Sequence, residues 1–231
     1  MINFPTLNLA LVLMLTMPFT ALFSQQSESD RSTWLVDTDR DPIYKRVFVD
    51  TDNFGPSYLD TLEAAYPRVS VDSVKFSILN DLAYYWHTRN LKRALELTRK
   101  GLKLTRSAGN KLWEGRFMIT EGAVLLRMEE LDSANVVLEQ AKPKVQVTDL
   151  PMLLTQQGYV YERKGNLDRA TELAYEALKL SEDLDDKKGI AVSFSDLSNL
   201  FWKHERFEEG LEFGLKSIDL FESRGLNDMD Y

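Results

Sequence analysis

The sequence predicts an all-α protein, a solenoid of antiparallel helix pairs, and two observations support this fold class. In the stretch Leu154 to Glu182, Gly158 is followed three residues later by Tyr161, twelve later by Ala170 and nineteen later by Ala177. This frame of small and large residues occurs four times in the chain, at intervals of 40, 36 and 40 residues, a period typical of stacked helical repeats. Its other copies are Leu82, Tyr85, Ala94 and Gly101; Gly122, Leu125, Ala134 and Ala141; and Ser198, Phe201, Gly210 and Ser217.

The spacing has a simple physical reason. Two antiparallel helices that pack closely need compact side chains where their backbones approach, here Gly158 and Ala170, and a large side chain beside that contact, here Tyr161. Gly165 and Asn166 interrupt the helical pattern between them, because glycine tolerates the left-handed backbone that ends a helix. Each copy therefore predicts a helix, a tight turn and a second helix.

Ahead of the repeats the chain has three segments. Residues 1–24 carry an apolar run, a proline and then small residues, which predicts a secretory signal peptide; an uncleaved signal anchor is the alternative. Residues 25–56 are polar without a helical period and are expected to be a poorly structured linker. Residues 57–70 predict a short helix that packs on the first end of the array, since the ends of a solenoid need covering.

The repeat array is assigned to residues 71–231, with repeats at about 75–108, 115–148, 151–184 and 191–224. In the first repeat Leu82 occupies a place that is small elsewhere, so Ala83 and Trp86 form an alternative pair with a turn one residue shorter. Pro143 is expected to end the second repeat, and Asp149 to cap the helix that follows.

The last predicted helix, 207–221, has apolar residues on more than one face, including Phe213 and Leu220. A solenoid normally hides such a face. We therefore expect that the natural chain continues past Tyr231 or that this helix mediates self-association.

Composition argues against several classes of function. The chain has no cysteine, so thiolate metal sites and cysteine nucleophiles are excluded, and its formal net charge of −8 disfavours nucleic acid as a partner. His87 and His204 have no second histidine at ligand spacing, and neither a phosphate-binding glycine loop nor a serine elbow is present. We expect no enzymatic activity, no cofactor, no metal and no membrane span beyond the signal segment.

The four copies of small residue, aromatic or large residue, turn and alanine resemble tetratricopeptide repeats over residues 75–224. This resemblance implies a right-handed superhelix that binds a protein or peptide. Two segments, LNDLAYYWHTRN and LSEDLDDKKGIAVSFSDLSN, further resemble the extracytoplasmic sensor arrays of Bacteroidetes-type bacteria, in which such repeats precede a membrane helix and a kinase or DNA-binding output.

In tetratricopeptide arrays the first helix of each repeat lines the binding groove. By that resemblance the groove would contain nine residues: Trp86, His87, Arg116, Arg127, Tyr159, Arg163, Asn199, Trp202 and Lys203. Aromatic and basic groups together suit a peptide that is acidic or ends in a free carboxylate. Alternatively, Trp86 and Trp202 only pack between repeats. The sequence thus predicts a non-enzymatic binding scaffold, secreted or periplasmic; the alternative is the sensory region of a membrane-bound signalling receptor whose output half lies beyond this chain.

Overall fold

The computed structural model describes residues 55–223, and within them it contains nine α-helices and no strand. The signal peptide and most of the linker predicted above fall on residues 1–54, outside the described part. The helices are α3 (Gly55–Ala65), α4 (Asp72–Trp86), α5 (Leu91–Ser107), α6 (Lys111–Arg127), α7 (Leu131–Ala141), α8 (Leu150–Arg163), α9 (Leu167–Asp183), α10 (Lys187–Lys203) and α11 (Phe207–Glu222), with 3-10 turns η2 (Lys142–Lys144) and η3 (Val147–Asp149) between α7 and α8.

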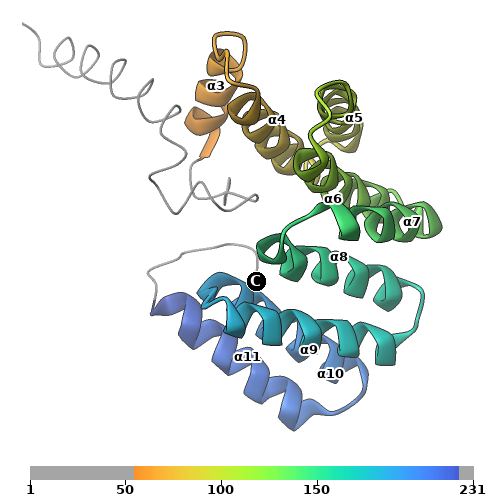
Figure 1. Ribbon diagram of the computed structural model, residues 1–231. Helices are drawn as coiled ribbons and strands as arrows, with labels where there is room; N and C mark the ends of the chain where they lie inside the picture. The colour runs from red at the N-terminus through yellow and green to blue at the C-terminus, as the bar shows by residue number, and fades with distance from the viewer. Residues whose placement is uncertain (1–54, 224–231) are drawn as a thin grey trace, which may run out of the picture. The chain divides into compact units, whose positions relative to one another are not determined.

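The helices pack in successive pairs, α4 with α5, α6 with α7, α8 with α9 and α10 with α11 (Figure 1). Each second helix also packs on the first helix of the next pair, as α9 does on α10. The first helices touch one another in turn, α4 with α6, α6 with α8 and α8 with α10. The prediction of an all-α array of helix pairs is confirmed, and the first helices form a layer of their own.

Compact residues lie where the paired helices come closest. A Cβ atom added to Gly158 would lie 3.7 Å from the carbonyl oxygen of Ala170, and one added to Gly122 would lie 2.6 Å from Leu138 Cδ2. Ala170 is fully buried at the first contact, and at the second the missing side chain of Gly122 leaves room for the fully buried Leu138. The helices can nest at this distance because the residues at the crossing have little or no side chain.

Three of the turns inside pairs share one geometry. The residue before the second helix's N-cap has a left-handed backbone: Glu129 (φ 60°), Gly165 (φ 78°) and Glu205 (φ 60°). The next amide then donates to the carbonyl five residues back, as Asn166 does to Tyr161 at 2.9 Å. This is the pattern that ends many helices.

The first pair turns differently. The amide of Asn90 donates to the carbonyl of Trp86, four residues back, at 2.7 Å, and no residue between α4 and α5 has a positive φ. The hydrogen bond that closes this turn therefore spans one residue fewer than in the other pairs, although four residues separate α4 from α5 and three separate the helices of the other pairs. This favours the alternative register, in which Ala83 and Trp86 take the places that Leu82 and Tyr85 have in the simple frame.

The link between the second and third pairs is also irregular. Pro143 lies in η2, directly after α7, as expected from its missing amide hydrogen. Asp149 stands at the N-cap of α8, but its side chain makes no capping bond to that helix. The sequence prediction is wrong on this point, because the carboxylate instead accepts hydrogen bonds from the amide of Gln146, just before η3, and from Nε of Arg116 in α6.

Candidate protein-binding surface

The predicted groove residues all lie on or directly after first helices. They are Trp86 in α4 and His87 just after it; Arg116 and Arg127 in α6; Tyr159 and Arg163 in α8; and Asn199, Trp202 and Lys203 in α10. The structure divides them into a polar seam between α8 and α10, a row of cations at helix ends, and residues engaged inside the array or near its ends.

The seam joins α8 to α10 through two carboxylates that the sequence analysis missed. The Tyr159 hydroxyl donates to Asp196 Oδ1 at 2.8 Å. Asn199 Nδ2 donates to Glu162 Oε1 at 3.1 Å, and the Lys203 ammonium pairs with the same carboxylate. Three predicted groove residues are thus brought together, and all three are held by groups of the chain itself.

The seam also perturbs two titrating groups. Burial raises the pKa of Asp196 to about 7, the nearby charge of Glu162 raises it further, and the hydrogen bond from Tyr159 opposes the rise. Burial, with the charge of Asp196 next in size, raises the pKa of Tyr159 well above its ordinary value. The Asp196 carboxyl therefore changes between its protonated and ionised forms near neutral pH, while the Tyr159 hydroxyl stays protonated and remains a hydrogen-bond donor.

A row of cations ends three consecutive first helices. Arg127, Arg163 and Lys203 are the last residues of α6, α8 and α10, each five residues after the small residue of its repeat. A cation at the last residue of a helix interacts favourably with the negative end of the helix dipole. Arg163 pairs with Glu129 of the preceding turn, while Arg127 is exposed and makes no ion pair with another residue of 55–223.

Arg116 does not reach the surface of the first-helix layer. Its Nε donates to Asp149 Oδ2 at 3.2 Å, and its guanidinium lies 4.8 Å from the centre of the Trp113 ring. Both partners of the ion pair are almost fully buried, so this arginine ties α6 to the start of α8.

The residues at the two ends of the array have local partners as well. His87 is buried and stacks on Tyr84 with ring centroids 4.2 Å apart, and its Nδ1 contacts the Tyr84 carbonyl. Trp86 packs edge-on against Tyr85 at 5.2 Å. Trp202 is 64% exposed, and its ring packs edge-on against that of Phe207 in α11, with centroids 4.7 Å apart.

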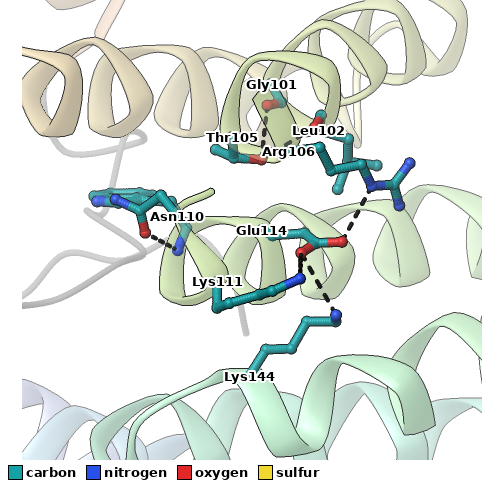
Figure 2. A network of polar contacts seen from close by, with 9 residues as sticks. Gly101, Leu102, Thr105, Arg106, Asn110, Lys111, Glu114 and Lys144 are labelled. Atoms are coloured by element: carbon teal, nitrogen blue, oxygen red, sulfur yellow. Dashed lines mark hydrogen bonds and ion pairs between the residues drawn. The ribbon is translucent and has the colours of Figure 1, made fainter. Parts of the chain in front are cut away.

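A second polar network joins α5, α6 and η2 at the turn between the first and second pairs (Figure 2). Glu114 accepts from Arg106 at 3.1 Å and lies 3.5 Å from both Lys111 and Lys144. Burial alone would raise the pKa of Glu114, but the bond from Arg106 and the charges of Lys144 and Lys111 outweigh it, so the pKa is lowered. The network holds consecutive pairs together, as the seam does further along the chain.

Within residues 55–223 no three histidine, aspartate or glutamate side chains gather as metal ligands would. His204 Nε2 lies 3.9 Å from Asp168 Oδ1 and far along the chain from His87. Over the same residues, no helix combines the length and the apolar character needed to cross a membrane.

Comparison with solved structures identifies the architecture. The chain is similar to BtubC (BKLC) from P. vanneervenii, with a TM-score of 0.58 and 14% identity over 88% of this chain and 92% of that one. It is also similar to a putative kinesin light chain from P. anserina with nearly identical TPR-like repeats, with a TM-score of 0.50 and 11% identity over 73% of this chain and 87% of the other. The chain has the tetratricopeptide-repeat fold. No family model and no curated protein matches the sequence. The helix pairs described above are thus tetratricopeptide-type repeats, an architecture in which stacked units create extended surfaces for binding.

Proposed function

We propose that this chain is a non-enzymatic, tetratricopeptide-type scaffold that binds a protein or peptide along its first helices. The observation that carries the proposal is the row of Arg127, Arg163 and Lys203 at equivalent positions of three consecutive repeats. Such a row is unexpected on a chain with a net charge of −8. It provides evenly repeated cations for a ligand with several carboxylates or a free C-terminus.

The existing ion pairs allow such a ligand to enter. Arg127 makes no ion pair among the described residues, and both partners of Arg163–Glu129 are more than half exposed, at 55% and 61%. An exposed pair of this kind contributes about 0–1 kcal/mol. A ligand carboxylate can therefore replace Glu129 beside Arg163 at little cost, with the Tyr159 ring and Asn199 nearby for further contacts.

The place of action is proposed from the sequence. Residues 1–24 have the composition of a secretory signal, which supports a secreted or periplasmic scaffold. N-terminal sequencing of the mature protein from the periplasmic or culture fraction tests this. A product that begins at Met1 and stays with the cytoplasmic fraction would contradict it.

A second candidate is the sensory region of a membrane-bound signalling receptor. It is favoured by the resemblance of residues 79–90 and 180–199 to extracytoplasmic sensor arrays. The two candidates separate on whether the reading frame continues past Tyr231 into a span of about 20 apolar residues followed by a kinase or transcriptional domain.

Peptide binding tests the groove directly. We would measure fluorescence anisotropy with a pool of labelled acidic peptides that end in a free carboxylate and with the same pool amidated. The double variant R127Q/R163Q should weaken binding at least about tenfold, which corresponds to about 1.4 kcal/mol. The matched control is R169Q, since Arg169 also carries a surface ion pair, with Glu172 on the second helix α9. Equal affinities for the double variant and the wild type, or no binding of either pool, would argue against the proposal.

A further inference from the structure

The last described helix, α11, carries a stripe of large apolar side chains that face solvent. Phe207, Leu211, Leu215 and Ile218 are spaced four, four and three residues apart, so they lie on one face of the helix. Their exposed fractions are 47%, 64%, 58% and 49%. Trp202 continues this face through its contact with Phe207. These five residues are the α11 stripe.

The rest of α11 is accounted for within the array. Phe213, predicted to lie on an unpaired apolar face, packs inward, and its ring stacks on that of Phe201 with centroids 5.4 Å apart. Ser217 and Gly210 are buried toward α10, and the Ser217 hydroxyl donates to the carbonyl of Ala191 at 2.9 Å. The helix is therefore firmly placed, and the stripe is a second, separate apolar face.

The equivalent face in the preceding repeat indicates what kind of element packs on the stripe. Forty residues earlier, the same positions on α9 are Leu167, Thr171, Tyr175 and Leu178. Leu178 and Leu167 pack in a cluster with Leu197, Leu200 and Phe201 of α10. The Tyr175 ring lies 6.4 Å from that of Phe201. The face of α9 that corresponds to the stripe is thus the one on which the next helix, α10, lies (Figure 1).

The stripe is more apolar than its counterpart, because a leucine replaces Thr171 and another replaces Tyr175. A contiguous exposed patch of large apolar side chains marks an interaction site on a soluble surface. Since the matching face of α9 accommodates a helix side by side, an α-helix with apolar residues at three- and four-residue spacing fits the α11 stripe as well.

The charges beside the stripe select among possible helices. Glu208, Glu212 and Asp219 follow one edge of the stripe, and Glu222 lies at its end; all four are exposed. Only Glu212 has a cationic partner among the described residues, Lys216 at 2.6 Å. In an antiparallel pair of two copies the same edges would meet, which would set carboxylates against carboxylates. Charge complementarity instead favours a helix with basic side chains along its edge.

We infer that the α11 stripe is a docking site for an amphipathic helix of another protein, with apolar residues on one face and lysine or arginine along its edge. This surface shares only Trp202 with the predicted groove and contains none of the cations Arg127, Arg163 and Lys203. The inference can therefore be tested independently of the function proposed above.

The test uses a probe that the chain itself supplies. A synthetic peptide copying Lys187–Lys203 reproduces the helix that covers the matching face of α9, and it carries Lys187, Lys188 and Lys203 against a single aspartate. A second peptide replaces these three lysines by glutamate. Binding of both to the full chain would be measured by calorimetry at two salt concentrations.

The basic peptide should bind at least about tenfold more tightly than the acidic one, with an advantage that shrinks as salt is added. The double variant L211S/L215S should weaken the basic peptide at least about tenfold, while keeping its helical circular dichroism, since both side chains face solvent. The matched control V136S removes a similarly exposed apolar side chain from α7, 54% accessible, and should bind the basic peptide as the wild type does.

Equal affinity for both peptides, or no binding of either, overturns the inference. So does a concentration-dependent dimer, seen by sedimentation equilibrium, that L211S/L215S abolishes, because the occupant would then be a second copy.

Discussion

Alanine at two buried glycines of the array should change stability in opposite directions. Gly158 in α8 and Gly101 in α5 are both helical and both buried. A Cβ atom at Gly158 meets Ala170 O at 3.7 Å and Leu173 Cβ at 3.9 Å, which are ordinary van der Waals contacts. A Cβ atom at Gly101 would lie 2.2 Å, 2.3 Å and 2.6 Å from three atoms of the Phe117 ring.

The magnitudes follow from these distances. Alanine in a helix interior is more favourable than glycine by about 0.8–1.0 kcal/mol. At Gly158 nothing opposes that gain, so we expect G158A to stabilise the protein by about 0.5–1 kcal/mol. At Gly101 the fully buried Phe117 ring would have to move, and overpacking of this kind costs about 1–3 kcal/mol. The 2.2 Å approach to this ring puts the cost in the upper part of that range, about 2–3 kcal/mol, so after the helix gain is subtracted G101A should destabilise the protein by about 1–2 kcal/mol.

Thermal and urea unfolding, followed by helical circular dichroism, measure the difference. For a chain of this length 1 kcal/mol corresponds to about 2–4 °C in Tm, so the two variants, which differ by about 1.5–3 kcal/mol, should differ by about 3–12 °C. G122A is an internal control, because Gly122 has the same place in its repeat as Gly158 but its added Cβ would lie 2.6 Å from the buried Leu138 side chain. We expect G122A to lose stability. A G158A protein as unstable as G101A would refute the reasoning from these distances.

Three further predictions concern single side chains. R116M should lower the free energy of unfolding by about 3–5 kcal/mol, because it leaves the buried Asp149 carboxylate without its cation. R127M, at the exposed end of the same helix, should change it by no more than about 0.5 kcal/mol. Urea unfolding midpoints compare the two variants, and equal losses would contradict the buried ion pair. The folded pKa of Asp196, about 7, lies above its ordinary value of 3.8, so its contribution to stability is fully present below pH 3.8 and is lost as pH rises to about 7. D196N should therefore flatten the decline in stability between about pH 4 and about pH 7, and an unchanged slope would speak against the raised pKa. E205G should gain about 0.5–1 kcal/mol in thermal unfolding, because glycine adopts φ 60° without strain, and a loss would mean that the Glu205 side chain contributes there.

The helix pairs could be predicted because close packing leaves a local signature. Where backbones approach, only glycine, alanine or serine fits, and the turn that follows needs a residue that tolerates positive φ. Gly158, Ala170 and Gly165 show both conditions within a dozen residues. At the first pair the same signature is ambiguous, because Leu82 and Ala83 are both buried and only the hydrogen bond from Asn90 to Trp86 decides the register.

The repeat pattern could not predict which of the two arginines of α6 is buried and which is exposed. Arg116 and Arg127 lie on one helix, yet Arg116 is buried and Arg127 is exposed. What separates them is Asp149, 33 residues further along, which the η3 turn brings back against α6. That turn is irregular, and its geometry leaves no periodic pattern in the sequence.

The carboxylates of the seam could have been found from the repeat period. Lys203 meets Glu162 at a separation of 41 residues, Tyr159 meets Asp196 at 37, and Thr120 donates to Asn80 at 40. First helices stack side by side, so residues about one repeat apart become neighbours. Writing the repeats beneath one another would have predicted opposite charges in contact, and would have shown that most polar groove residues also hold the array together.

Because Arg163 and Lys203 already form ion pairs within the array, the cost of breaking each pair predicts where along the groove a ligand carboxylate binds. Releasing Arg163 from Glu129 returns a mostly exposed carboxylate to water, at a cost of about 0–1 kcal/mol. Releasing Lys203 is more costly, because the Glu162 side chain is only 13% exposed and would keep a desolvated charge near the Asp196 carboxyl. The ligand carboxylate should therefore bind at the ends of α6 and α8, and R163Q should weaken an acidic peptide more than K203Q does in the same anisotropy assay. If K203Q has the larger effect, the strength of the existing ion pairs does not decide which cation the ligand uses.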